Sequence, residues 1–338
     1  MKTRTSAQTS RAKAPNRRRC LVTGAGGFAG SHLVELLLSE GHQVSAALAT
    51  QEDPENLAHL GKQIERVRFD LTSASRTSKL LMQTRPEWIF HLAGFSSVGR
   101  SFSHERMTYD INFGGTLNVL EAAKGLPDLD KLIIVSSADV YGAFQPRGKL
   151  LSENQRLSPI SPYGISKAAA EHLSRLYHRN YGLPVVITRP FNHIGPRQSD
   201  TFALPAFCKQ IALIESGKQR ALIKVGDLSV KRDLSDVRDI VSGYLAAAKA
   251  GRHGETYQLC SGRSVKLESV LRSLLKKSDK SIKISVDGAR LRPVDIPVLR
   301  GDNSKAVKEL GWAPRYGLQQ ALDSCLDYWR QKAARKEL

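Results

Sequence analysis

The first residues in this sequence that could do chemistry are Tyr163 and Lys167, which stand four positions apart in the segment YGISK. The segment follows Pro162 and opens an amphipathic stretch, so a helix would place both side chains on one face. A nearby ammonium favours the ionised phenol, and we expect Lys167 to lower the pKa of Tyr163 toward the range useful for proton transfer. An isolated pair of this kind is more often a tyrosine stem beside a surface lysine, so the surrounding residues decide its meaning.

A second group of polar residues closes the apolar run DKLIIVSS, in the stretch VSSADVYG. Ser136 and Ser137 present two hydroxyls there, and Asp139 presents a carboxylate. An aspartate at a strand end commonly bonds to local backbone N–H groups. The residues alone leave that structural role and a contact with a substrate hydroxyl equally open for Asp139.

Three glycines lie between a short apolar strand and a helical stretch, in TGAGGFAG. Gly24, Gly27 and Gly30 would let the turn approach a pyrophosphate, with the N–H groups of the helix N-terminus pointing at it. In this setting the glycines predict a dinucleotide site. The next strand ends at Ala49 and offers neither the acidic residue that reads the ribose of NAD nor an arginine for the 2′-phosphate of NADP. The choice between NAD(H) and NADP(H) therefore stays open.

Apolar strands and amphipathic helices alternate along the first part of the chain. We expect strands at 20–24, 42–48, 64–71, 88–94, 131–137 and 183–190, and helices at 31–41, 112–125 and 161–182. Strands this apolar, separated by helices, predict a parallel sheet covered on both faces, in a doubly wound Rossmann-type α/β fold. Beyond residue 190 we expect helices at 202–217, 241–251 and 264–278 and a strand at 281–287. These elements predict a smaller α/β C-terminal substrate lobe.

The domain boundaries follow from this pattern. We expect a disordered basic tail at 1–18, an NAD(P)-binding Rossmann domain at 19–190 and mainly the substrate lobe at 191–338, with segments near 233–262 returning to the first domain. The net charge is +19, and residues 1–19 contain no acidic residue and no apolar stretch typical of a secretory signal. A disordered, solvated tail is favoured over a contact with nucleic acid or an anionic membrane.

The composition excludes several classes of protein. No stretch of the 338 residues approaches the roughly 18 to 20 apolar residues of a membrane span. The four cysteines show no C-x-x-C spacing, which favours free thiols in a reducing compartment and excludes a cysteine metal site. We therefore expect a cytoplasmic protein without a structural metal.

Together, the segments TGAGGFAG, HLAG, DINFGGTLN, VSSADVYG and YGISK resemble the extended short-chain dehydrogenase/reductase family, over about residues 19–330. The resemblance implies NADP(H) or NAD(H) as the cofactor and a catalytic set of Ser137, Tyr163 and Lys167, with Asp139 beside it. The residues that it assigns to cofactor binding are Gly24, Gly27, Phe28, Ala29, Asp70, Leu71, Leu92, Ala93, Gly94, Asn112, Tyr163, Lys167, Pro190, Asn192 and His193.

The segments RPFNHIGPRQS, IKVGDLSVKRDLSDVRDIV, YQLCSG and RLRPVDIP narrow the resemblance to the GDP-mannose branch of the nucleotide-sugar enzymes. The implied reaction is NAD(P)H-dependent reduction of the C4 ketone of a GDP-4-keto-6-deoxy-hexose. Arg232 and Arg292 would hold the diphosphate, since guanidinium geometry suits phosphate oxygens. The full set of implied substrate-binding residues is Ser96, Ser97, Asn192, Arg197, Lys209, Val225, Arg232, Arg292 and Asp295.

Asp139 separates two reactions within this branch. The similar 4,6-dehydratases carry a glutamate two residues before YG, as the base at sugar C5. Aspartate is shorter by one methylene, roughly 1.5 Å, and a displacement of about 1 Å at a reacting centre can cost around a hundredfold in rate. A ketone reductase needs no such base. Reduction is therefore favoured, and a 4,6-dehydratase or another nucleotide-sugar dehydratase or epimerase is the alternative.

The resemblance also implies a homodimer with a four-helix contact, made by the helix after Asn112 and the helix that carries Tyr163. The sequence itself shows only that both helices carry ample apolar residues. A third hypothesis is a catalytically idle protein that binds nucleic acid through its basic tail. The intact Ser137, Tyr163 and Lys167 argue against it.

Overall fold

The computed structural model describes residues 17–51, 55–142, 144, 150–291, 294–335 and 337–338, so most of the predicted basic tail lies outside the described residues. Arg18, at the end of that tail, is already held by the fold. Its guanidinium donates to the Glu87 carboxylate at 2.9 Å.

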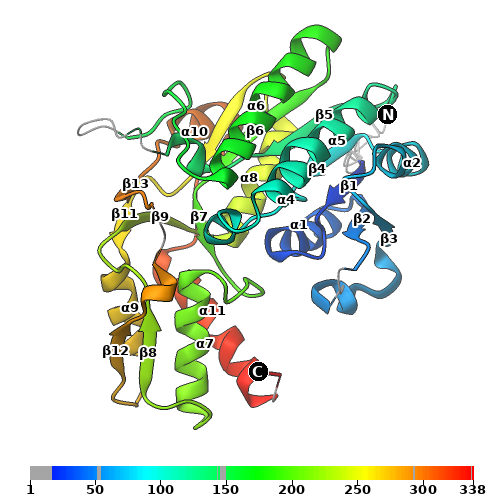
Figure 1. Ribbon diagram of the computed structural model, residues 1–338. Helices are drawn as coiled ribbons and strands as arrows, with labels where there is room; N and C mark the ends of the chain where they lie inside the picture. The colour runs from blue at the N-terminus through cyan, green and yellow to red at the C-terminus, as the bar shows by residue number, and fades with distance from the viewer. Residues whose placement is uncertain (1–16, 52–54, 143, 145–149, 292–293, 336) are drawn as a thin grey trace, which may run out of the picture.

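A sheet of seven strands, in the order β10-β6-β5-β4-β1-β2-β3, forms the centre of the larger part of the molecule (Figure 1). The strands are β1 (Arg19–Thr23), β2 (Gln43–Ala49), β3 (Glu65–Phe69), β4 (Trp88–His91), β5 (Lys131–Val135), β6 (Val185–Pro190) and β10 (Thr256–Leu259). Every pairing is parallel. The strand order reverses beside β1, which confirms the predicted doubly wound Rossmann-type fold.

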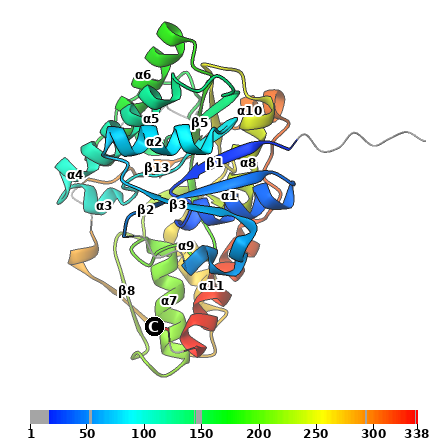
Figure 2. The same ribbon diagram turned by 90° about the vertical axis from the view of Figure 1, so that its right-hand side faces the viewer.

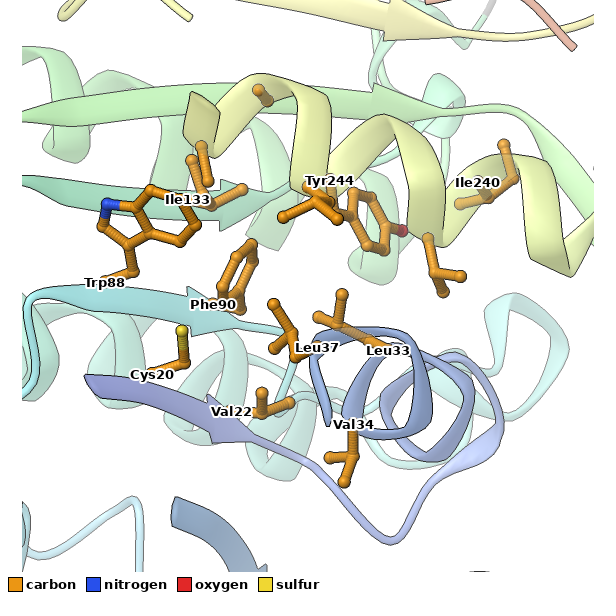
Figure 3. Packing of buried hydrophobic residues seen from close by; sticks show 14 of the residues in the cluster. Cys20, Val22, Leu33, Val34, Leu37, Trp88, Phe90, Ile133, Ile240 and Tyr244 are labelled. Atoms are coloured by element: carbon orange, nitrogen blue, oxygen red, sulfur yellow. The ribbon is translucent and has the colours of Figure 1, made fainter. Parts of the chain in front are cut away.

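Helices cover both faces of the sheet because successive strand residues point to opposite sides. Val22 and Phe90 pack with the helices of one face in one core, seen in Figure 3, whereas Leu21 and Ile89 pack with the helices of the other face in a second core. The helices of the first face are α1 (Phe28–Ser39), α8 (Val237–Ala250) and α10 (Ser304–Leu310). Those of the second face are α2 (Ala74–Thr84), α5 (Gly115–Ala123) and α6 (Pro162–Tyr181).

The C-terminal lobe has a core of its own and lies below the sheet in both ribbon views (Figures 1 and 2). Its helices are α7 (Ala203–Glu215), α9 (Leu267–Leu275) and α11 (Leu318–Ala334), and its strands β8 (Leu222–Val225) and β12 (Lys283–Val286) pair in parallel. Ile211, Leu271 and Leu322 are among the buried residues that join the three helices. The lobe therefore packs as a unit beside the sheet.

A small second sheet joins the two parts. It runs β11-β9-β13, with β7 also paired to β9. Its strands are β7 (Asn192–Ile194), β9 (Lys231–Asp236), β11 (Ser264–Lys266) and β13 (Val298–Leu299). The chain leaves β9 directly into α8 and then adds β10 to the edge of the large sheet. This junction brings residues of the lobe to the region that follows β6.

Two expected helices begin later than their patterns suggest. A π-helical turn at Asp110–Gly114 precedes α5, so the regular helix starts at Gly115. Residues 264–266 pair with β9 as β11, and α9 therefore starts at Leu267. The apolar pattern does not predict α2, α10 or α11, nor the strands of the junction.

Candidate active site

Tyr163 and Lys167 lie on the first two turns of α6. Ser161 caps this helix and Pro162 occupies its first position, as both residues favour. Tyr163 is buried, and the Lys167 ammonium donates to the carbonyl of Val135 at 2.9 Å. The pair therefore meets the carboxyl end of β5, the edge at which open parallel sheets bind ligands.

Ser137 and Asp139 follow β5 directly, at the short helix η3 (Ala138–Tyr141). The Ser137 hydroxyl accepts from the Asp139 N–H at 3.1 Å and donates to the Asp139 carboxylate at 3.0 Å. Both side chains also influence the pKa of Tyr163, the carboxylate raising it and the hydroxyl lowering it. The structure thus brings together all four predicted catalytic residues, Ser137, Asp139, Tyr163 and Lys167.

The pKa values of the pair differ from the expectation. Burial, followed by the negative charge of Asp139, raises the pKa of Tyr163 well above its ordinary value. Burial also lowers the pKa of Lys167 to about 8, and the Glu171 carboxylate opposes that change. The predicted lowering of the tyrosine pKa by lysine is therefore wrong for this structure, because burial and the Asp139 charge outweigh the one opposing cause, the Ser137 hydrogen bond. The phenol stays protonated, which is the form of a proton donor.

The glycine turn between β1 and α1 is packed against backbone. Gly24 has a φ of +69°, and a Cβ there would lie 2.9 Å from the backbone of Ala93. A Cβ on Gly30 would lie 2.0 Å from the Gly24 carbonyl oxygen. Gly27 precedes α1 and supplies no side-chain cap for its first N–H groups. An uncapped helix N-terminus behind a turn without side chains fits a pyrophosphate, so these residues suit a dinucleotide.

The loop after β4 runs between the glycine turn and the lysine. The Ala93 N–H donates to the Thr23 hydroxyl at 3.1 Å. A Cβ on Gly94 would lie 2.8 Å from the Asn112 side-chain oxygen and 3.5 Å from the Lys167 ammonium. Only a residue without a side chain fits there, so the loop can pass close to a flat ligand.

Asn112 holds this loop in place. Its side-chain oxygen accepts from the Phe95 N–H at 2.7 Å, and its amide nitrogen donates to the Phe95 carbonyl at 3.1 Å and to the Ser166 hydroxyl at 2.9 Å. Ser166 precedes Lys167 on α6. The amide is thus engaged with protein groups, and any effect of Asn112 on a bound cofactor would pass through the loop that it fixes.

The other predicted cofactor residues are spread over the same edge of the sheet. Phe28, at the start of α1, stacks on His193 of β7 with ring centroids 5.5 Å apart and planes 13° apart. Asp70 follows β3, and hydrogen bonds from Thr72 lower its pKa, so its carboxylate is ionised. Ala29 lies next on α1, Leu71 packs against Gly115, Leu92 follows β4, and Pro190 and Asn192 flank the step from β6 to β7.

The residues predicted to bind the substrate fall into separate places. Arg232 of β9 is 8% exposed and donates to the Ile296 carbonyl at 2.6 Å and to the Asp295 carboxylate at 2.5 Å. Arg292 lies outside the described residues. Val225 is fully buried in the core of the lobe, and its carbonyl accepts from the Asp287 N–H at 2.8 Å, so the structure does not present it to a ligand.

A cavity of about 500 Å³ opens between α7 and β8, and Lys209 lies in its wall. Lys209 donates to the Asp200 carboxylate at 2.8 Å. The sequence reasoning missed the other basic residues of this wall, Arg220, Lys224 and Arg290. Four basic side chains against one carboxylate give the cavity a positive character that suits a phosphorylated ligand. Only the local excess of positive charge in GKQRALIK could have indicated it.

Arg197 lies with the cofactor elements and not with Arg232. Its guanidinium donates to the Glu35 carboxylate at 2.6 Å and to the Ser31 hydroxyl at 3.3 Å, both on α1. Ser96 is exposed, and the Ser97 hydroxyl accepts from the N–H of Arg100 as the cap of α3 (Val98–Ser101). The structure therefore does not bring Arg197 to the predicted diphosphate group.

Comparison with known proteins agrees with this geometry. A family model described as GDP-mannose 4,6 dehydratase matches residues 21–325. The chain belongs to the GDP-mannose 4,6-dehydratase family. This membership confirms the resemblance to the short-chain dehydrogenase/reductase enzymes that the motifs indicate.

Curated relatives of three activities are similar over most of the chain. GDP-6-deoxy-D-mannose reductase of Pseudomonas aeruginosa is 32% identical over 93% of this chain and 98% of the relative. GDP-mannose 4,6-dehydratase of Vibrio cholerae serotype O1 is 29% identical, over 90% and 91%. UDP-glucose 4-epimerase 4 of Oryza sativa subsp. japonica is 30% identical, over 94% and 91%.

Solved structures show the same architecture. The RMD protein of Pseudomonas aeruginosa complexed with NADPH superimposes with a TM-score of 0.80 at 31% identity, over 93% of this chain and 99% of that one. UDP-glucuronic acid 4-epimerase of Bacillus cereus, in complex with UDP-glucuronic acid and NAD, gives 0.80 at 29% identity, over 92% and 99%. The two neighbours hold different nicotinamide cofactors, so they leave the preference of this chain open.

The described ranges contain no helix with the length and hydropathy to cross a membrane. The same ranges hold no group of three His, Cys, Asp or Glu side chains that could bind a metal ion.

Proposed function

We propose that this enzyme reduces the C4 ketone of a GDP-4-keto-6-deoxy-hexose with NAD(P)H, as in the synthesis of a GDP-D-rhamnose-type sugar. The observation that carries the proposal is the turn after β5. Asp139 stands where the similar dehydratases carry a glutamate, and its carboxylate accepts from Ser137 at 3.0 Å. A short carboxylate that is hydrogen-bonded within its own turn supports a reaction that needs no base at sugar C5.

The catalytic residues suit ketone reduction in their protonation states. When bound, the reduced nicotinamide supplies a hydride to C4. Tyr163 then protonates the developing alkoxide, and its raised pKa keeps the phenol in the donor form. On substrate binding, the Ser137 hydroxyl would turn its proton from the Asp139 carboxylate to the same oxygen. Lys167 holds the ribose next to the nicotinamide and supplies positive charge at the site.

The GDP moiety would lie across the junction and the lobe. Arg232 would exchange part of its contact with Asp295 for diphosphate oxygens, with Arg292 as its partner. The cavity at Lys209 would take the nucleoside end, with Leu213 and Leu222 available to the base and the basic side chains of its wall facing the phosphates. Ser96, Ser97 and Asn192 lie near the surface and are assigned to the hexose.

The test is an assay of the purified protein with the 4-keto sugar nucleotide and either NADPH or NADH. We expect stoichiometric loss of the reduced-cofactor absorbance at about 340 nm, because a reductase consumes one cofactor per turnover. Running both cofactors in parallel gives the preference. Unchanged absorbance with the keto sugar, together with a 4-keto product from GDP-mannose, would contradict the proposal.

A nucleotide-sugar dehydratase or epimerase is the second candidate, favoured by the relatives that carry those names. Both reactions use the same Ser137, Tyr163 and Lys167 and leave the cofactor unchanged overall. Mass spectrometry of the nucleotide that co-purifies with the protein would distinguish them. A GDP-6-deoxy-hexose supports the first proposal, an intact GDP-hexose supports a dehydratase, and a UDP-hexose supports an epimerase.

The proposed assembly is a homodimer that pairs α5 and α6 of two copies. Met107, Phe113, Ile165 and Leu176 are each 38–43% exposed, and the last two lie on α6. Light scattering of the protein and of Ile165→Lys tests this, since a monomeric variant of a dimeric parent is the expected result. A monomeric parent contradicts it. The cytoplasmic location is likewise a proposal, supported by four buried free cysteines.

A further inference from the structure

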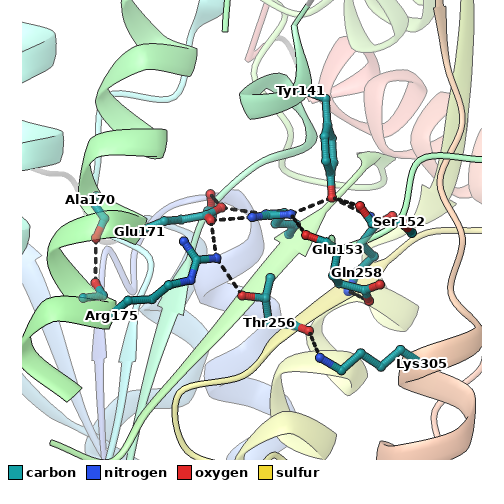
Figure 4. A network of polar contacts seen from close by, with 12 residues as sticks. Tyr141, Ser152, Glu153, Ala170, Glu171, Arg175, Thr256, Gln258 and Lys305 are labelled. Atoms are coloured by element: carbon teal, nitrogen blue, oxygen red, sulfur yellow. Dashed lines mark hydrogen bonds and ion pairs between the residues drawn. The ribbon is translucent and has the colours of Figure 1, made fainter. Parts of the chain in front are cut away.

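A buried polar network lies behind the catalytic group and contains residues that the mechanism above does not use (Figure 4). Ser136 donates to the Glu171 carboxylate at 2.5 Å, and Arg189 donates to both oxygens of that carboxylate at 2.8 and 2.7 Å. Glu171 is 0% exposed and Arg189 is 2% exposed. A buried ion pair is weak evidence for net stability, because desolvation of both charges offsets their attraction. This pair therefore needs another explanation.

The network holds both ends of the segment that carries Ser137. Ser136, at the start, is tied to Glu171. Tyr141, at the end, accepts from Arg189 at 2.7 Å. Its hydroxyl also accepts from Gln258 of β10 and donates to the carbonyl of Ser152 at 2.9 Å. Ser137 and Asp139 lie between these two fixed points.

The same network is anchored on the helix that carries the catalytic pair. Glu171 lies on α6 one turn after Lys167, on the same face of the helix. Arg175, one turn further, donates to the second Glu171 oxygen at 2.9 Å from the solvent side. One carboxylate thus joins the end of β5 to α6, and these two elements supply Ser137 on one side and Tyr163 with Lys167 on the other.

We infer that Glu171 is a positioning residue, which acts through Ser136 and Arg189 to hold Ser137 at its working place opposite Tyr163 and Lys167. The kinetic part of this inference rests on the proposed function. The geometric part rests only on the buried contacts.

The charge of Glu171 has a second effect, on Lys167. Burial opposes ionisation of Glu171, but the Arg189 and Arg175 guanidinium groups and the Ser136 hydroxyl outweigh it, and the pKa falls. The resulting negative charge raises the pKa of Lys167 against its own desolvation. The other titratable groups around the site are Tyr163 on α6, Asp139 on η3, His91 on β4 and Tyr244 on α8. Of these, His91 stays neutral, because burial lowers its pKa to about 3.

Two variants separate the two effects. Ser136→Ala removes one anchor and leaves the charge of Glu171, so we expect kcat to fall about tenfold, with unchanged KM and an unchanged basic limb of the pH profile. Glu171→Gln keeps the size and an acceptor but removes the charge. It should move the basic limb to lower pH by about 1 unit as well as lowering kcat. The pKa that sets this limb can also be measured from the pH dependence of NADPH or NADH affinity, which needs no sugar.

Ser174→Ala is the matched control, because Ser174 is a buried hydroxyl on α6 that donates only to its own helix, at 2.7 Å to Ala170. We expect less than a twofold change in kcat. Equal kcat values for Ser136→Ala and Ser174→Ala overturn the positioning role, and this holds even where Glu171→Gln fails to fold. If Glu171→Gln folds and the basic limb of its pH profile does not move, the effect of the Glu171 charge on Lys167 is overturned. The parent enzyme could fail to turn over the keto sugar while Glu171→Gln still moves the basic limb of cofactor affinity. That result rejects the proposed reaction and leaves the inference about Glu171 standing.

Discussion

Two buried arginines, Arg189 of β6 and Arg232 of β9, differ in what surrounds them. Arg189 meets a carboxylate that is itself 0% exposed, and its remaining N–H groups reach Tyr141 and a backbone carbonyl. Arg232 meets Asp295, whose side chain is 25% exposed. A partner that water can reach can be exchanged for a ligand at little cost, and a fully buried partner cannot. The first arginine therefore belongs to the scaffold, and the second keeps the exchangeable contact that its proposed diphosphate role requires.

The same contrast extends to the regions around them. Behind α6 and β5, buried groups fix one another, so changes there should alter the rate of the chemical step or the fold. Around α7, β8 and β9, basic groups pair with carboxylates that are partly exposed, as Lys209 does with Asp200. Changes there should alter KM. Each experiment below tests whether a residue behaves as its own side of this division requires.

The largest expected effect is that of Tyr163→Phe, on the fixed side. Loss of the proton donor should lower kcat by about 10²- to 10⁴-fold, the usual contribution of general acid catalysis. Affinity for the reduced cofactor, measured by fluorescence titration, should change little, since the ring remains in place. A variant with near-normal kcat would show that another group protonates the product.

Much of this fixed side follows from the sequence, for a physical reason. Strand, glycine turn and helix are contiguous, so local patterns predict that Gly24 and Ser137 follow strands and that Tyr163 and Lys167 share a helix, as the structure shows. The sequence places Glu171 one turn after Lys167 on the expected helix, but its partner Arg189 lies on the strand β6. Nothing local indicates that the two meet.

The lobe is less predictable because its site is assembled from distant segments. Arg232 and Asp295 come together only through the junction strands, and the pattern does not predict β9 or β13. Arg197 shows the opposite error. It lies close in sequence to the lobe, yet a positive φ of 72° and the Glu35 contact turn it to the cofactor side.

The next expected effect is on stability, from Arg189→Met. Removing one partner of a buried pair should lower the free energy of unfolding by about 3–5 kcal/mol, because the Glu171 charge then stays buried. Urea denaturation measures this. Arg330→Met is the control, since Arg330 forms a bidentate pair with Glu215 at 2.8 Å but is 35% exposed. Its loss should cost no more than about 1 kcal/mol. Equal losses would remove the distinction between the two kinds of arginine.

On the exchangeable side, Arg232→Met should raise KM for the sugar nucleotide about 10- to 100-fold, the value of a hydrogen bond to a charged group. The value of kcat should remain within a few-fold, because the residue does not touch the reacting atoms. Arg272→Met provides the control, an exposed arginine of the same lobe whose partner among the described residues is Glu268. An unchanged KM for Arg232→Met, or a loss confined to kcat, would place this arginine with the scaffold instead.

The smallest expected effect is a graded one, the dependence of kcat/KM on pH. The pKa of Lys167 is lowered to about 8, so the ammonium is present below that pH and is lost as the pH rises through it. Tyr163 remains protonated over the same range, since its pKa is raised. Activity should therefore be level near neutrality and fall about tenfold per pH unit above about 8, as expected for loss of a single proton. Arg232→Met should keep this limb, because Arg232 belongs to the other side of the site. If Arg232→Met moves the basic limb of the kcat/KM profile, the region around Arg232 is coupled to Lys167, and burial alone does not separate the two regions.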